Sequence, residues 1–173
     1  GEMAAYEKAA RQIFSGSKLQ TDDLVQMNTA LVNGEIDAYF TGGTYTASPA
    51  RYDGETQVRG ITPKTGPFGG KGGIVWVEVT SVVNNPNVSP LAEDFLEYAQ
   101  EPDASKAVAF SEGTYNPVSQ MSDPKVFSKF DKDELNAIQW DSLEEELANS
   151  TDYGINPDYD KMIEIYNAAK REA

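Results

Sequence analysis

The chain has 173 residues, enough for one domain or two small ones, and 39% of them are apolar. Its 28 acidic and 14 basic residues give a formal net charge of −14, which argues against nucleic acid and against an anionic membrane surface as partners. The absence of Cys and His from the sequence excludes disulfides, thiolate or imidazole metal ligands, and Ser–His or Cys–His catalysis, so any chemistry must use carboxylate, lysine or tyrosine side chains.

Residues 1–34 predict two helices. Apolar side chains recur at helical spacing from Tyr6 to Phe14, and Ser15-Gly16-Ser17 is expected to end the first helix. The second helix is predicted to begin near Thr21-Asp22-Asp23, because acidic residues suit a helix N-terminus, and to stop at Asn33-Gly34.

Three stretches in the next part of the chain predict β-strands. Residues 35–40 and 57–61 are short runs with strand character. The longest stretch, 72–83, is rich in Val and lies between glycines and Asn84-Asn85-Pro86, which is typical of a buried strand. The loop 62–70, rich in Gly and Pro, leads into it and is the expected crossing between domains.

The rest of the chain predicts mainly helices. One helix over 91–99 follows Ser89-Pro90, a capping residue with proline at the first helical position. A shorter helix is expected over 102–113, several short ones within 122–149, and a last one after Asn156-Pro157. Together with the strands, these helices predict a mixed α/β protein.

The central strand carries the first candidate site. Period-two alternation places Trp76 and Glu78 on the face opposite Val77. Because a buried carboxylate is costly unless it is paired, Glu78 needs a partner. It could pair with a Lys or Arg, receive a cationic ligand together with Trp76, or act as the acid or base of an enzyme. The strand by itself leaves all three open.

Five stretches, 34–43, 54–66, 72–78, 102–106 and 113–117, carry a resemblance to a known family. They read GEIDAYFTGG, GETQVRGITPKTG, GGIVWVE, PDASK and GTYNP. The third is similar to the family's Gly-Gly-Ile-x-Trp-x-Asp strand, and the second contains its Pro-Lys-x-Gly pattern. In this order they resemble the C-terminal part of a periplasmic solute-binding protein of an ABC transporter, of the polyamine (spermidine/putrescine) class.

The resemblance implies a binding protein and not an enzyme. In that family, aromatic side chains enclose the methylene chain of the polyamine, and carboxylates hold its ammonium ends. Carried over position by position, Phe40 and Trp76 would be walls of the site, Glu78 would bind an amine, and Tyr115 would line the cleft. Phe40 stands where the family often has Trp, and Glu78 where it has Asp, changes that would reshape the pocket. The resemblance implies no catalytic residue, metal ligand or cofactor.

The resemblance also implies a fold: the C-terminal portion of a type II periplasmic-binding-protein fold, α/β, with a mixed sheet flanked by helices. Residues 1–41 would be the tail of the second lobe, 42–72 the crossing segment into the first lobe, and 73–173 the returning part of the first lobe with the C-terminal helices. About half of the family's usual length would then lie outside this sequence. Exposed strand edges could in that case support a homodimer.

The implied location is the periplasm, or the outside of a Gram-positive cell with a lipid anchor, and the implied partner is the membrane permease of the transporter. The chain shows no signal peptide, so we expect any export signal to have been removed or to lie outside this sequence.

Other functions remain open at this point. The solute could be another amine, an amino acid or a metal complex. An enzyme using Glu78 would need a second carboxylate within about 5–10 Å, and a structural domain would pair Glu78 with a basic residue.

A micromolar dissociation constant requires about 8 kcal/mol of binding free energy, whereas one ammonium over one ring supplies about 0.5–2 kcal/mol. We therefore expect weak polyamine binding, or none, by this chain alone.

Overall fold

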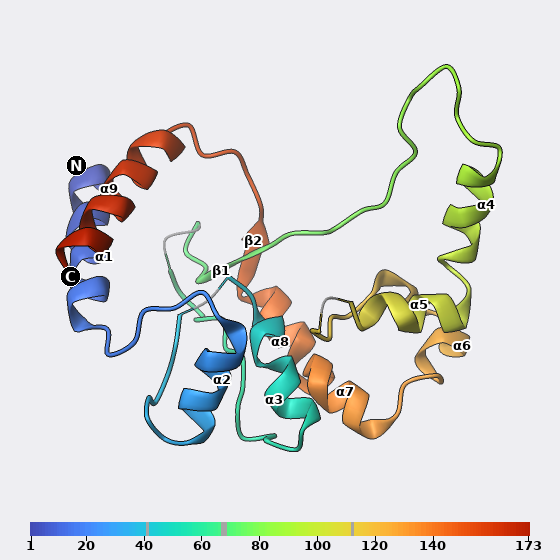
Figure 1. Cartoon of the computed structure of the whole chain (residues 1–173), viewed down its shortest axis with the longest axis horizontal. Helices are drawn as coiled ribbons and strands as arrows, with labels where there is room; N and C mark the ends of the chain where they lie inside the picture. The colour runs from blue at the N-terminus through green and yellow to red at the C-terminus, as the bar shows by residue number, and fades with distance from the viewer. Residues whose placement is uncertain (41, 67–68, 112) are drawn as a thin grey trace. The chain divides into compact units, whose positions relative to one another are not determined.

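The computed structural model describes residues 1–40, 42–66, 69–111 and 113–173 (Figure 1). Helices account for 51% of the structure and strands for 4%, and the described residues contain a single sheet of two parallel strands. The predicted α/β fold, with the mixed sheet of a type II periplasmic-binding protein, is therefore wrong.

The described elements follow the chain in this order: α1 (Glu2–Gly16), α2 (Leu24–Val32), η1 (Thr44–Ala47), α3 (Ser48–Tyr52), β1 (Gly73–Val75), α4 (Leu91–Tyr98), α5 (Pro102–Ala109), η2 (Ser119–Ser122), α6 (Pro124–Phe127), α7 (Lys132–Ile138), η3 (Trp140–Ser142), α8 (Leu143–Ala148), β2 (Ser150–Asp152) and α9 (Tyr159–Glu172).

The chain forms two compact units. Unit 1 consists of Gly1–Ala30 and Gly154–Ala173, and unit 2 consists of Leu31–Tyr153. The assignment to two lobes, with boundaries at 41 and 72, stays a prediction, and residue 41 lies outside the described residues.

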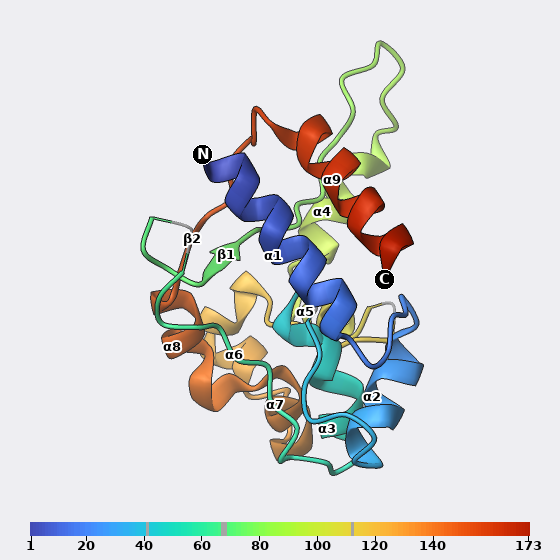
Figure 2. The same ribbon diagram turned by 90° about the vertical axis from the view of Figure 1, so that its left-hand side faces the viewer.

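Unit 1 is built on α1 and α9, which lie side by side (Figure 2). Their contact buries Ala10, Ile165 and Ala169. The rings of Phe14 and Tyr166 pack edge to face, with centroids 5.0 Å apart. The small side chains let the helix backbones approach, and the aromatic pair adds about 0.5–1.5 kcal/mol beyond the burial of its area. The helix predicted from Tyr6 to Phe14 is confirmed as part of α1.

Unit 2 has its core where α5, η2, α6 and α7 meet. The buried side chains there are Ala109, Met121, Val126, Phe130 and Ile138. The start of α7 is fixed by a capping box, in which Asp131 and Glu134 each accept a hydrogen bond from the backbone of the other. The same Glu134 carboxylate, which is buried, lies 2.7 Å from the ammonium of Lys106 on α5. The capping box therefore fixes the start of α7, and the ion pair connects α7 to α5.

The predicted strand over 72–83 is reduced to β1. Its three residues pair in parallel with β2, Gly73 opposite Ser150 and Val75 opposite Asp152. Residues 76–83 are exposed and have no strand structure, and neither do residues 35–40 and 57–61. A strand needs a neighbour to pair its backbone groups and cover its side chains. The strand-like composition of 72–83 is therefore not sufficient to form a long strand, because β2 provides only three residues for pairing.

Arg51 of α3 takes the place of a strand neighbour for part of the stretch 57–61. Arg51 is 3% exposed, and its guanidinium donates hydrogen bonds of 2.7 Å to the carbonyl oxygens of Thr56, Val58 and Asn136. Burial lowers the pKa of Arg51, as does the charge of Arg59. One side chain thus joins α3, the loop after it and α7, which lie together in Figures 1 and 2.

Gln139 continues this arrangement along the same loop. It has a left-handed backbone (φ 62°) and a buried side chain. Its Oε1 accepts a hydrogen bond from the amide of Gly60 (2.9 Å), and its Nε2 donates one to the carbonyl oxygen of Gly60 (2.8 Å). Both backbone groups of Gly60 are satisfied as they would be in a sheet, but by an amide side chain.

Arg51→Met is expected to lower the free energy of unfolding by about 2–4 kcal/mol, because it leaves the buried carbonyl oxygen of Val58 and the partly buried ones of Thr56 and Asn136 without their charged donor. Chemical denaturation measures this loss. The matched control is Arg59→Met, which removes an exposed ion pair with Asp141 (3.1 Å) and should cost no more than about 1 kcal/mol. Equal losses in the two variants would contradict the role given to Arg51.

Candidate functional site

Trp76 follows directly after β1 and packs against Tyr45 of η1. The two rings meet edge to face, with centroids 6.1 Å apart and planes at 88°. A Cβ atom on Gly43 would lie 2.3 Å from Tyr45 Cε1, so only glycine leaves room for the Tyr45 ring in this position. Trp76 is 43% exposed, so this contact does not cover it completely.

Tyr115 lies in the loop after α5 and stacks on Tyr52, the last residue of α3. Their ring centroids are 4.6 Å apart and the planes differ by 24°. Phe110 packs edge-on against Tyr115, also at 4.6 Å. Tyr115 is half-buried, whereas Tyr52 is exposed.

Ser48, which is fully buried, connects the two aromatic pairs. Its hydroxyl donates a hydrogen bond to the carbonyl oxygen of Tyr45 (2.6 Å) and accepts one from the backbone amide of Tyr115 (2.8 Å). Tyr45 and Tyr52 are seven residues apart on one helical segment, so they lie on the same side of it, about 10–14 Å apart along its axis. We call Tyr45, Tyr52, Trp76 and Tyr115 the aromatic site.

The structure does not bring the other two predicted residues into these contacts. Phe40 is 87% exposed and makes no ring contact with another described residue. Glu78 is exposed and has no hydrogen bond or ion pair with any described residue. The shared strand face expected for Trp76 and Glu78 is absent, because β1 ends at Val75.

Carboxylates lie near Tyr115. Burial raises the pKa of its hydroxyl, and the interaction with the Tyr52 hydroxyl and the charges of Asp53 and Glu134 raise it further. A negative potential at an aromatic pair favours a cation, which gains both from the charge and from the ring face. Among the described residues, no group of three acidic side chains is arranged to hold a metal ion.

Lys106 shows how unit 2 already holds an ammonium group. Its Nζ lies 5.9 Å from the centroid of the Phe110 ring and 2.7 Å from Glu134 Oε1, and it donates a hydrogen bond to the carbonyl oxygen of Lys129 (2.9 Å). An amine from solution would be bound by the same three kinds of group: an aromatic ring, a carboxylate and a carbonyl oxygen.

The sequence did not predict Tyr45 and Tyr52 as site residues. The glycine pair Gly42-Gly43 was the available signal for Tyr45, since glycine permits close approach of another group to the backbone. No local pattern distinguishes Tyr52, because its partner Tyr115 is distant in sequence and the two meet only after folding.

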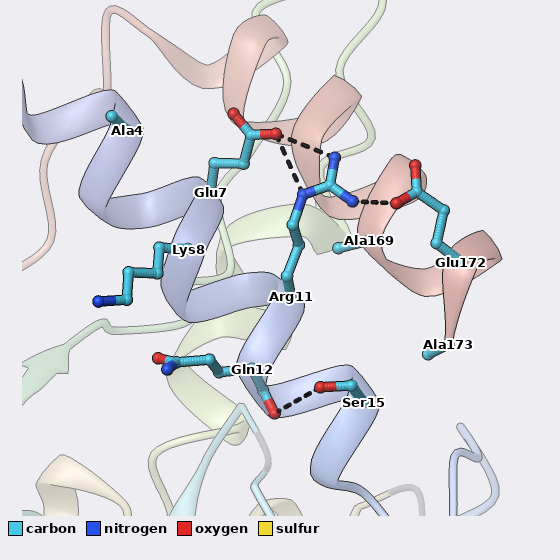
Figure 3. Close-up of a pocket in the computed structure, with 9 residues that line it drawn as sticks. All are labelled: Ala4, Glu7, Lys8, Arg11, Gln12, Ser15, Ala169, Glu172 and Ala173. Carbon is cyan, nitrogen blue, oxygen red and sulfur yellow. Dashed lines mark hydrogen bonds and ion pairs between the residues drawn. The ribbon is translucent and has the colours of Figure 1, made fainter.

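Unit 1 has a separate hollow of about 460 Å³ between α1 and α9 (Figure 3). Arg11 lies in it and bonds to Glu7 (2.9 Å from Nη2) and to Glu172. The hydrogen bond with Glu7 is the main reason why the pKa of Arg11 is raised. The guanidinium is thus occupied by the carboxylates beside it, and none of the predicted site residues lines this hollow.

Comparison of the chain with protein-family models, with curated proteins and with solved structures finds no match. Among the described residues, no helix has the length and apolar character required to cross a membrane.

Ser48→Ala is expected to lower the free energy of unfolding by about 1–2 kcal/mol, because the partly buried amide of Tyr115 loses its acceptor. It should also reduce the near-ultraviolet circular dichroism of the tyrosines, which depends on their fixed orientation. Ser128→Ala, at an exposed hydroxyl bonded to the carbonyl oxygen of Lys125, is the control and should change neither quantity measurably. Unchanged tyrosine signals in Ser48→Ala would contradict the connection between the pairs.

The free energy of unfolding should fall as the pH rises above about 10, the ordinary tyrosine value. Folding raises the pKa of Tyr115, so the folded chain holds this proton more tightly than the unfolded chain does. The contribution of Tyr115 to the free energy of unfolding is fully present below its pKa in the unfolded chain. It is lost as the pH rises through its pKa in the folded chain. Denaturation at a series of pH values measures the fall, and Tyr115→Phe should make it shallower. An unchanged slope in that variant would contradict the assignment to Tyr115.

Proposed function

We propose that this chain binds a small cationic solute, a polyamine of the spermidine or putrescine type, as the substrate-binding component of an ABC importer. One observation carries the proposal: Trp76 and Tyr115, which the resemblance assigns to the ligand, both contact tyrosines of the single helical segment 44–52, Trp76 edge to face with Tyr45 and Tyr115 stacked on Tyr52. The resemblance in 72–78 and 113–117 supplies the transporter class.

The chemistry of the aromatic site suits an extended amine better than a compact one. Its two ring pairs are separated by about two helical turns, so a ligand that touches both must have charged ends joined by a flexible apolar chain. The methylenes would lie against ring faces, and the ammonium groups against rings and carboxylates such as Asp53. The acidic composition raises the local concentration of such a ligand through its long-range potential.

The expected affinity follows from the exposure of the site. A cation over an exposed ring gains about 0.5–1 kcal/mol, and an exposed ion pair gains about 0–1 kcal/mol. Two of each give roughly 1–4 kcal/mol, and about 4 kcal/mol corresponds to a millimolar dissociation constant. The chain alone should therefore bind polyamines weakly.

The test uses Trp76 as its own reporter. The sequence has two tryptophans, and Trp140 packs in unit 2 against Phe127, so Trp140→Phe leaves Trp76 as the sole indole. Spermidine should change the Trp76 fluorescence with a dissociation constant in the millimolar range, and putrescine should act at higher concentration because it has one amine fewer. Tyr115→Ala in the same background should weaken the response several-fold.

The controls separate binding from ionic strength and from apolar contact. Sodium chloride at matched ionic strength tests screening, and 1,4-butanediol, which has the methylenes without the charges, tests the apolar chain. The same response to either one would contradict the proposal. So would the absence of a response to spermidine at about 100 mM, because a dissociation constant of that size corresponds to only about 1.4 kcal/mol, near the lower end of the expected range.

A further inference from the structure

Residues 72–105 have a one-sided charge distribution. No Lys or Arg occurs between Lys71 and Lys106, whereas the segment contains six acidic residues: Glu78, Glu93, Asp94, Glu97, Glu101 and Asp103. Asp103 pairs with Lys129. The other five are exposed, and the described residues provide no cation for any of them. The segment is therefore a surface of uncompensated negative charge.

The same segment exposes large apolar side chains. Val79 is 81% exposed, Leu91 66% and Phe95 59%, and α4 has no buried residue. The loop before α4 and α4 itself line an open hollow of about 440 Å³, which we call the α4 groove. Its apolar lining comprises Val82, Val83, Val88, Leu91, Ala92, Phe95 and Leu96. Contiguous apolar surface of this kind is uncommon on a protein without a partner.

Charge and apolar surface are arranged together on α4. At 100° per residue, the groove-lining positions Leu91, Ala92, Phe95 and Leu96 form one face of the helix. Glu93 and Asp94 flank this face on opposite sides, and Glu97 points away from it. The groove thus has an apolar floor and acidic margins.

We propose that the α4 groove is a docking surface for a basic amphipathic segment of another protein. Charge complementarity selects this occupant: an apolar helix face fills the groove while flanking Lys or Arg side chains reach Glu93 and Asp94. A second copy of this chain would bring the same acidic margins against each other, and like charges at an interface are strongly unfavourable. The inference is independent of the solute bound at the aromatic site.

The experiment measures binding of a fluorescein-labelled synthetic peptide of about 18 residues, five helical turns, with Leu and Lys placed so that one face is apolar and the other basic. Fluorescence anisotropy with the full chain should show saturable binding that weakens as salt is added. Phe95→Ser should weaken it at least about tenfold, because it removes a large ring from the floor of the groove. Leu147→Ser, at an exposed apolar residue of α8, should leave it unchanged.

Charge variants separate the groove from the general acidity of the chain. Glu93→Lys with Asp94→Lys should weaken binding about tenfold. Glu97→Lys with Glu144→Lys changes the net charge equally at positions away from the groove and should have a much smaller effect. Circular dichroism checks that every variant folds.

Three results would overturn the proposal. Equal weakening by both charge pairs, or unchanged binding in Phe95→Ser, would show attraction to the acidic chain without a groove. A dimer of the free chain in sedimentation, abolished by Phe95→Ser, would assign the groove to a second copy.

Discussion

The hydrogen bonds of Arg51 are the interaction on which unit 2 depends. A buried guanidinium without a carboxylate partner among the described residues is costly, and here three carbonyl oxygens replace the lost water. The planar fork of arginine directs several donors at once, which a lysine ammonium cannot reproduce. Because the acceptors belong to the loop at 56–58 and to α7, the position of α3 is fixed from two sides.

Both ring pairs of the aromatic site depend on this arrangement. At one end, Ser48 of α3 holds the backbone of Tyr115 beside Tyr52. At the other end, the loop held by Arg51 continues to Gly60, which Gln139 binds through both backbone groups. A Cβ on Gly60 would lie 2.8 Å from the Thr44 Cβ, so this loop passes directly against η1, which carries Tyr45. The site therefore rests on side-chain-to-backbone bonds where a larger sheet would use strand pairing.

Sequence patterns predicted the helices that depend on nearby residues. They did not predict the strand pairing and ring contacts that depend on residues distant in the sequence. Helices such as α1 and α4 are specified by the spacing of apolar residues that are close together in the sequence. Just before α4, the hydroxyl of Ser89 accepts a hydrogen bond from the Leu91 amide, although the N-cap position itself belongs to Pro90. Strand composition at 72–83 could not show that β2 is three residues long, because pairing is a property of two segments. The resemblance named Trp76 and Tyr115 as site residues, whereas Tyr45 and Tyr52, which contact them, are distant from them in the sequence and were marked by no local pattern.

The acidic composition acts differently at the aromatic site and at the α4 groove. Long-range attraction is screened beyond about 8 Å at physiological ionic strength, so the net charge can raise the rate of encounter with any cation but cannot distinguish a polyamine from a basic helix. Discrimination must come from contacts at short range. Stacked rings with a nearby carboxylate suit a thin chain with charged ends, whereas an apolar hollow with acids on both sides requires a wide apolar face. The two surfaces thus share one electrostatic field and differ in the shape of the cation that we propose for each.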